Sequence, residues 1–479
     1  MQEKSLDETV AELQKLFSNS PDLVVRKLKV GTKKAAVAFF ASATDIGQLS
    51  LGVISPLIDY KLEAEPTIEL LANEIVKSAN ASKIGNKDEY IQNLLSGQPV
   101  LFLDGSSQVL QFRIDQFAGR MPAEPPTSTV INGPREGFVE TLEINISLIR
   151  KRLRTPDLAI KSFKVGKYTA TRVCLCYINS IADKKIVKKL EQKIQEIDID
   201  GVLDSFYIES FLENHTHTMF KQFGYAEKPD IVVGKMLEGR IAILVDGSPI
   251  ALTVPFVLME DFQNSNDYYQ KSARGTFLRW LRLFSTIVAV LLPGTYIAVV
   301  LYHYKILPVK FLITIVNTTQ GIPFSPFLEM LFIIMLFEIL YEASLRMPRY
   351  LGMALAIVGA LILGDTAVRA GLVTPPAIMI AALTGVMLYT MPDQQHLLSL
   401  LRIMFAVIGG LLGLYGIVIG AIFLIAYMAN MDSYGAPYLG PFSPRIKSDL
   451  KDALTNSPLT DKKTRPRVIP NSNHRRQKQ

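Results

Sequence analysis

Three long apolar runs in the second half of the chain constrain its fold more than any other feature of the sequence. Residues 283–304, 370–392 and 403–431 contain no Asp, Glu, Lys or Arg. About 20 largely apolar residues are enough for one α-helix to cross a bilayer. The runs therefore predict an α-helical polytopic membrane domain, and they argue against a wholly soluble enzyme or a small disulfide-linked domain.

The formal net charge of +7 at pH 7 is unevenly distributed along the chain. Acidic and basic side chains nearly balance before the first apolar run, whereas the last fifty or so residues are strongly basic. A basic groove for nucleic acid in the first half is therefore a poor fit, and no interleaved aromatic residues in the tail support one. We expect no nucleic-acid partner, and a largely disordered tail near an anionic lipid surface.

The first half of the chain contains one pattern twice. A KVG step followed by a β-prone run occurs in residues 26–49 and again in residues 161–185. A β-prone phrase with a central Asp-Gly step occurs in residues 101–112 and again in residues 242–255. Asp-Gly between β-prone runs is typical of a tight hairpin, because glycine adopts positive φ without strain. The order of elements predicts a soluble region of two similar α/β subdomains, a tandem-like repeat.

The predicted organisation places this soluble region before the membrane domain. Arginines flank the predicted spans, and positive charge marks the cytoplasmic side; the flanking residues are Arg274, Arg279, Arg282, Arg346 and Arg349. These charges and the basic tail agree with four or six spans, but not with five. The domains expected are a first α/β subdomain at 1–124, a second at 125–275, a helical transmembrane domain of four to six spans at 276–431, and a basic cytoplasmic tail at 432–479.

No catalytic motif stands out in the soluble region. The sequence lacks a Gly-rich nucleotide loop, a GxSxG nucleophile motif and an HExxH metal motif. Cys174 and Cys176 form a CxC pair without a supporting His cluster, so two buried thiols are favoured over a metal site. Asp104 and Asp246 precede the hairpin glycines and are interpreted as turn residues. We expect no enzyme activity, no cofactor and no metal.

Two further apolar stretches, at 326–345 and 351–371, contain five ionisable residues between them. Glu338 and Glu342 lie four residues apart, on one face of a predicted helix, and Glu329 lies near the mouth of that helix. Carboxylates at membrane depth face a wet cavity or a partner charge. An ion-lining role and internal pairing both remain open for Glu338 and Glu342. Asp365 and Arg369 have the spacing of a helical ion pair.

A stripe of glycines marks the last apolar run. The spacing of i, i+4, i+7 and i+11 gives one smooth face that suits close packing of helices. The sequence leaves open whether that packing is within the chain or between subunits. The glycines are Gly409, Gly413, Gly416 and Gly420.

Three phrases carry a resemblance to a known family. They are GPREGF at 133–138, LVDGSPIALTVP at 244–255, and SYGAPYLGPFSPR at 433–445. Together they resemble the A subunit of the GerA-family nutrient germinant receptors of endospore-forming bacteria, over nearly the whole chain. The signature residues that the resemblance marks are Gly133, Pro134, Arg135, Glu136, Gly137 and Phe138.

The resemblance implies a receptor subunit of the spore inner membrane that triggers germination. Its partners would be a permease-like B subunit, which holds most of the nutrient recognition, and a C lipoprotein. Copies of the A subunit would form a homo-oligomer that acts as a nutrient-gated cation channel, with the soluble region and the tail in the cytoplasm. The alternative is a non-conducting scaffold that transmits the signal.

The GPREGF phrase can also be interpreted physically. Pro134 fixes φ, and the glycines on either side of PRE permit unusual turns, so the phrase predicts a shaped loop. Arg135 and Glu136 are available to bond to a neighbouring subdomain. The segment after the loop is amphipathic and ends in a cluster of cations, which predicts a helix with its cations at the negative pole. Domain packing and a gating contact between subunits remain the two interpretations of the loop.

Overall fold

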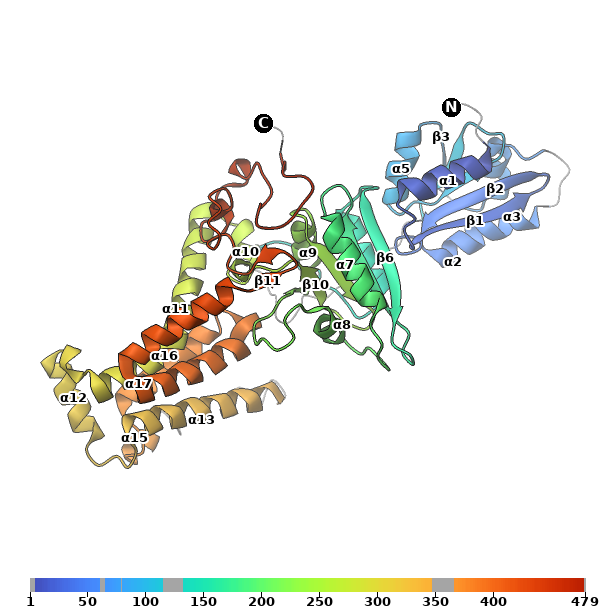
Figure 1. Cartoon of the computed structure of the whole chain (residues 1–479). Coiled ribbons are helices and arrows are strands. Elements are labelled where there is room, and N and C mark those ends of the chain that lie inside the picture. Colours follow the sequence, from blue (N-terminus) through green and yellow to red (C-terminus); the bar gives the residue numbers. More distant parts are fainter. Residues whose placement is uncertain (1–4, 61–64, 79, 115–131, 347–365, 478–479) are drawn as a thin grey trace. The chain divides into compact units, whose positions relative to one another are not determined.

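The computed structural model describes residues 5–60, 65–78, 80–114, 132–346 and 366–477 of the chain (Figure 1). These residues form two compact units. The first unit is the α/β part. It contains residues 1–256 together with residues 433–436 and 462–479. The second unit is helical and contains residues 257–432 and 437–461. The division agrees with the predicted fold class, an α/β soluble region followed by an α-helical domain.

The first subdomain of the α/β unit is built on a five-stranded antiparallel sheet in the order β1-β2-β4-β5-β3. Its strands are β1 (Leu23–Val30), β2 (Lys33–Phe40), β3 (Ala81–Ile84), β4 (Val100–Leu103) and β5 (Val109–Phe112). Its helices are α1 (Leu6–Leu16), α2 (Ile46–Leu49), α3 (Ser55–Asp59), α4 (Ile68–Leu70) and α5 (Lys87–Leu95), with π-helical turns at Ser50–Ile54 and Leu71–Ile75.

The second subdomain repeats this sheet in the order β6-β7-β9-β10-β8, again antiparallel throughout. The strands are β6 (Leu158–Val165), β7 (Thr171–Ile178), β8 (Gly224–Ala226), β9 (Ile241–Val245) and β10 (Ala251–Val254). The helices are α6 (Leu142–Arg152), α7 (Lys184–Gln195), α8 (Ser205–Leu212) and α9 (Pro229–Met236). Because the two orders match strand for strand, the predicted tandem repeat is confirmed.

Both Asp-Gly steps lie at the hairpins that the sequence predicts. Gly105 and Gly247 have φ of +74° and +90°, a conformation that glycine adopts without strain. In each repeat the turn aspartate accepts a hydrogen bond from the first residue of a helix: the Leu6 N–H donates to Asp104 at 3.3 Å, and the Leu142 N–H to Asp246 at 3.2 Å. The two aspartates therefore link the hairpin turns to the first residues of α1 and α6.

A buried ion pair joins the two subdomains within the α/β unit. Arg150 of α6 donates from Nε and Nη2 to the two carboxylate oxygens of Asp22, each at 2.9 Å. The guanidinium also lies 4.0 Å from the ring centre of Phe40. The hydroxyl groups of Ser20 and Ser42 donate to the same carboxylate. Removal of either partner would leave a buried charge without compensation, so the pair specifies how α6 docks on the first subdomain.

The helical unit contains two helices that are long and apolar enough to cross a membrane, counting only the described residues: Ser272–Tyr302 and Pro392–Ala429. The helix at Pro326–Arg346 is comparably long but contains three glutamates, and the apolar helix at Pro375–Leu388 is shorter. The number of crossings therefore stays a prediction. The helices of this unit are α10 (Ser265–Tyr268), α11 (Ser272–Tyr302), α12 (Val309–Thr319), α13 (Pro326–Arg346), α15 (Ala367–Arg369), α16 (Pro375–Leu388) and α17 (Gln395–Ala429).

Helix α17 is not one straight rod. Gly413 has φ of +65° and ψ of −157°, which interrupts the helix. A Cβ placed on Gly420 would lie 3.3 Å from side-chain atoms of both Phe405 and Ile408, so the segment after the interruption returns along the segment before it. The apolar run that the sequence presents as one candidate span is therefore two packed arms joined at a glycine.

The C-terminal segment differs from the largely disordered tail that the sequence predicts. Val468 and Ile469 are buried, at 5% and 1% exposure. The Ser472 N–H donates to the Ile181 carbonyl at 2.8 Å, and Arg465 Nε donates to the Leu237 carbonyl at 2.7 Å. The two apolar residues and these bonds hold residues of the tail against the second α/β subdomain, and composition alone does not reveal them.

Candidate functional site

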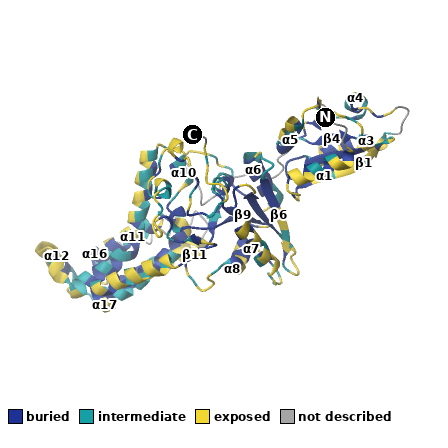
Figure 2. Ribbon diagram, turned by 45° about the horizontal axis from the view of Figure 1, so that its top comes forward, coloured by how far each residue is buried: buried dark blue, intermediate teal, exposed yellow. Residues whose placement is uncertain are grey.

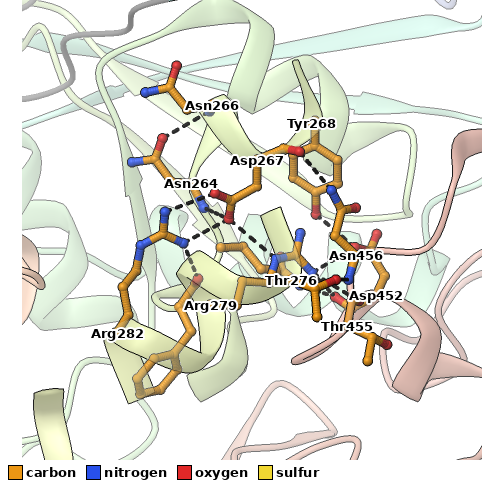
Figure 3. Close-up of polar contacts among 12 residues, drawn as sticks. Asn264, Asn266, Asp267, Tyr268, Thr276, Arg279, Arg282, Asp452, Thr455 and Asn456 are labelled. Carbon is orange, nitrogen blue, oxygen red and sulfur yellow. Dashed lines mark hydrogen bonds and ion pairs between the residues drawn. The ribbon is translucent and has the colours of Figure 1, made fainter. Parts of the chain in front are cut away.

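A buried carboxylate, Asp267, binds two arginines at the start of α11 (Figure 3). Arg282 donates to both of its oxygens, at 2.7 and 2.8 Å, and Arg279 Nε donates to one of them at 3.3 Å. The side chains of Asp267 and Arg279 are fully buried. The carboxylate also accepts the Asn264 N–H as part of a capping box of α10. Asp267 therefore fixes α10 on the first turns of α11.

The same arginine holds the segment that follows α17. Nη1 of Arg279 donates to the Asp452 carbonyl at 2.9 Å, to the Asp452 carboxylate at 3.0 Å and to the Ala453 carbonyl at 2.8 Å. The Asn456 side chain donates to the Asp267 carbonyl at 2.7 Å, while the Asn456 N–H donates to Thr276. Residues 452–456 are therefore bound to the N-terminal end of α11.

A glycine of α11 makes room for this contact. A Cβ on Gly275 would lie 2.8 Å from Nδ2 of Asn456 and 3.0 Å from the Asp267 carbonyl oxygen. Sequence reasoning assigned Arg279 and Arg282 to the positive charge that flanks a span, and missed their partners. The signal for Asp267 is its place three residues after Asn264, the spacing of a capping box.

The SYGA phrase lies within the α/β unit, although it follows α17 in the chain. The Phe256 N–H donates to Ser433 Oγ at 3.0 Å, and this hydroxyl donates to the Gln222 carbonyl at 2.8 Å. The Tyr434 hydroxyl donates to the Leu212 carbonyl at 2.6 Å. Burial raises the pKa of the Tyr434 hydroxyl, so it remains a proton donor at physiological pH.

Two lysines of α7 cover the ring of this tyrosine. The ammonium groups of Lys189 and Lys193 lie 4.9 and 5.4 Å from its ring centre. Such cation–π contacts and the hydroxyl bond hold Tyr434 against α7 and α8. The sequence singled out SYGA only as part of a family resemblance, because the contact joins residues more than two hundred positions apart.

The GPREGF loop packs on α6 of its own subdomain. Glu136 accepts from Lys151 at 2.8 Å and from Arg152 at 2.7 Å, and the bond from Lys151 is the main reason that the pKa of Glu136 is lowered. Phe138 is buried in the second subdomain, and its N–H donates to the Glu227 carbonyl.

The glycines and the proline of this loop lie around that contact. Gly133 has φ of +112°, as expected for a shaped loop. Pro134 is half-buried, Arg135 is exposed and Gly137 is buried. The loop therefore orients α6, the helix that carries the inter-subdomain ion pair.

The glutamates of α13 each have a bond to another part of the helical unit or to their own helix. Glu338 accepts from Arg402 of α17 at 2.5 Å, and the Arg402 side chain is 1% exposed. Glu342 pairs with Arg346 at 2.6 Å on the exposed face of α13. The sequence did not identify Arg402 as a partner, because it lies more than sixty residues away, immediately before the apolar run at 403–431.

The remaining ionisable residues of the membrane half lie elsewhere. Glu329 is buried, at 1% exposure, and accepts the Thr374 N–H at the start of α16, where the helix dipole favours a carboxylate. Arg369 ends the short helix α15, and Asp365 lies outside the described residues. Among the described residues, the three glutamates of α13 therefore bind at three different places and not in one site.

The glycine stripe contributes to packing within the chain. Gly409 faces Gly294 of α11 so closely that an added Cβ would lie 2.3 Å from the Gly294 carbonyl oxygen. Gly413 provides the reversal of α17, and Cβ atoms on Gly416 and Gly420 would meet side chains of the preceding arm. Contact of the stripe with another subunit stays a prediction.

Within the described ranges, no group of three or more His, Cys, Asp and Glu side chains is placed to hold a metal ion. Cys174 and Cys176 are buried in β7. Burial raises the pKa of the Cys174 thiol to about 11, so the thiol is protonated and unreactive at neutral pH.

A tandem α/β unit joined to a helical unit with long apolar helices is typical of a membrane-associated protein. Residues 11–468 match the family model described as Bacillus/Clostridium GerA spore germination protein. The chain belongs to this family, and the resemblance noted in the sequence is confirmed.

The relatives cover nearly the whole chain. Spore germination protein KA of Bacillus subtilis (strain 168) is 33% identical over 97% of this chain and 87% of its own length. Spore germination protein GerLA of Bacillus cereus is 32% identical over 98% of this chain and 96% of its own. The uncharacterized membrane protein YfkQ of Bacillus subtilis (strain 168) is 38% identical over 78% of this chain and 73% of its own.

One solved structure is also similar. It is the crystal structure of the N-terminal domain of the A subunit of the Bacillus megaterium spore germinant receptor GerK3. It covers 53% of this chain and 98% of that chain, with 31% sequence identity and a TM-score of 0.41.

Proposed function

We propose that this chain is the A subunit of a nutrient germinant receptor of the spore inner membrane. In this proposal it works with a permease-like B subunit and a C lipoprotein, and it has no enzymatic role. Copies of the chain assemble, and their membrane helices form a nutrient-gated cation channel. The family match over residues 11–468 and the two helices long enough to cross a membrane support this function.

The ion pair between Glu338 and Arg402 carries the channel part of the proposal. Arg402 is buried, yet Nε and Nη1 have no hydrogen-bond partner among the described residues. A buried guanidinium with unsatisfied donors is costly, so the pair is a weak point of the closed packing between α13 and α17. Glu338 is more exposed, at 26% of its side chain. Separation of the pair would leave this carboxylate in a wet path, where it favours cations.

A non-conducting scaffold is the second candidate. Its support is that Glu329, Glu338 and Glu342 all have bonds within the structure, as internal pairing requires. In this case the helical unit would only transmit the nutrient signal to other subunits.

The two glutamates of α13 provide a matched pair of variants. Spores that lack this chain would be complemented with Glu338→Gln or with Glu342→Gln, and compared at equal protein abundance for nutrient-triggered cation release. The channel predicts a changed rate or ion preference for Glu338→Gln, because its partner is buried, and little change for Glu342→Gln, whose pair with Arg346 is exposed. Normal release by both variants would remove Glu338 from the conduction path and favour the scaffold.

The contacts of Arg279 also support an even number of membrane crossings. The N-terminal end of α11 and residues 452–456, which follow α17, are bound to each other, so both lie on one face of the membrane. The arginines at this end of α11 favour the cytoplasmic face, as the localisation of the soluble region and the tail requires.

A further inference from the structure

Helix α8 is apolar on two opposite faces. Ile208 and Leu212 are fully buried in the core of the second subdomain. The outward side carries large apolar side chains on the helix and on the loops before and after it. These are Leu203, Phe206, Tyr207, Phe211 and Met219, which are 70%, 63%, 39%, 46% and 52% exposed. A surface helix of a globular protein normally presents polar residues on that side, so this face is built to contact something.

A row of exposed lysines lies on the neighbouring helix. Lysines alternate with buried apolar residues along α7, which packs against α8. Figure 2 shows exposed and buried residues along α7, which lies beside the buried strands of the second sheet. Lys193 donates to the Leu212 carbonyl at 2.7 Å, so the lysine row reaches the end of α8. The exposed lysines of the row are Lys184, Lys185, Lys188 and Lys189.

A short stretch of sequence connects the residue that binds the end of α8 to a candidate membrane span. Tyr434 donates to the carbonyl of Leu212, the last residue of α8. Only residues 430–433 separate this tyrosine from α17 in the sequence. Five residue steps span at most about 18 Å of extended chain. The length of this covalent link allows an apolar surface on α8 to reach the lipid headgroups.

We propose that the exposed face of α8 together with the lysines of α7, here called the α8 surface, docks on an anionic lipid bilayer. Apolar side chains enter the interface while lysines bind the negatively charged headgroups, the composition typical of peripheral membrane contacts. A second copy of the same surface is a poorer occupant, because the lysine rows would repel each other. The docking goes beyond the receptor function and would hold α7 and α8, and with them Tyr434, at the membrane.

The docking is tested with the full chain reconstituted in vesicles. Ser210 lies on the exposed face of α8, so Ser210→Cys labelled with an environment-sensitive fluorophore reports on the surroundings of this face. The native cysteines are buried and do not compete for the label. One set of vesicles contains phosphatidylglycerol, and a second set contains only phosphatidylcholine. Both sets are prepared with and without brominated acyl chains, which quench nearby fluorophores.

We expect quenching by brominated lipid in the anionic vesicles, and at least a threefold weaker effect in the neutral ones or in high salt, which screens the lysines. Phe206→Ser combined with Phe211→Ser should abolish the quenching, and both side chains are exposed, so the fold is retained. Lys185→Gln combined with Lys188→Gln should weaken it several-fold.

A charge-matched control uses two exposed lysines of the first subdomain. Lys29→Gln combined with Lys34→Gln removes the same charge from a cross-strand pair far from α8 in the sequence, and should leave the quenching unchanged. A label that stays in water in both kinds of vesicle would overturn the proposal. A label that is shielded but insensitive to brominated lipid would also overturn it, and would show that protein covers the α8 surface.

Discussion

The carboxylate of Asp267 offers the sharpest test of how the helical unit is held together. The change is Asp267→Asn, which keeps the size of the side chain and removes its charge. In the structure this carboxylate neutralises Arg279, which is fully buried, and Arg282, whose side chain is 15% exposed. Asp452 remains as the second carboxylate bound to Arg279.

The expected cost follows from the burial of the pair. Removal of one partner of a buried ion pair costs about 3–5 kcal/mol, because the other charge stays buried without compensation. For a unit of this size, each kcal/mol lowers the melting temperature by about 2–4 °C, so we expect a decrease of roughly 6–20 °C. Residues 452–456 should also become accessible to protease at lower temperature, since Asp267 and Arg279 hold them.

The assay is thermal unfolding of the full chain in detergent, followed by circular dichroism and by limited proteolysis. Asp198→Asn is the control, because Asp198 is 83% exposed and its ion pair contributes less than about 1 kcal/mol. If Asp267→Asn unfolds at the same temperature as this control, the carboxylate does not hold α11 and the C-terminal segment together, and our assignment of the site is wrong.

Two further variants test the reversal of α17 and a buried carboxyl group. Gly413→Ala should lower the free energy of unfolding by about 2–3 kcal/mol, because φ of +65° is strained for any other residue. The added Cβ would also press on Tyr302 and His303. An unchanged melting temperature in thermal unfolding would argue against the reversal of α17. Burial raises the pKa of Glu209 from 4.5 to about 7, despite a hydrogen bond from Tyr225. The folded protein thus binds this proton more tightly than the unfolded chain does, and stability falls by about 3 kcal/mol as the pH rises from 4.5 through 7. Glu209→Gln should remove this fall and unfold at a higher temperature than the wild-type chain at pH 8, and equal pH profiles of the two proteins would refute the shift.

The α/β repeat was predictable because its signals are local. The Asp-Gly steps specify hairpins, and the alternation of strand and helix patterns recurs in the same order in both halves. The glycine stripe was likewise recognisable as a packing feature. Its interruption at Gly413 was not, because a regular glycine period is compatible with one straight helix, and only the contacts of Gly420 with Phe405 and Ile408 reveal the reversal.

The polar contacts made by the segments that flank α11 and α17 in the sequence were not predictable from the sequence. Each joins residues from distant parts of the chain, such as Arg279 with Asp452 or Tyr434 with Leu212. Their charges and hydroxyl groups look like ordinary surface residues until folding brings the partners together and removes water. For the same reason the sequence indicates that the Glu338 carboxylate is costly at membrane depth, but it does not identify Arg402 as the partner of this carboxylate.

The sequence by itself determined the class of protein: apolar runs require a bilayer or a buried core, period-two and hairpin patterns require sheets, and three short phrases mark the family. The tertiary structure decided which charged side chains are neutralised and which residues neutralise them. It also decided that α17 reverses its direction at Gly413 and that an apolar face of α8 stays exposed. The physical reason is that local patterns depend on neighbours in the chain, whereas burial and charge pairing depend on neighbours in space.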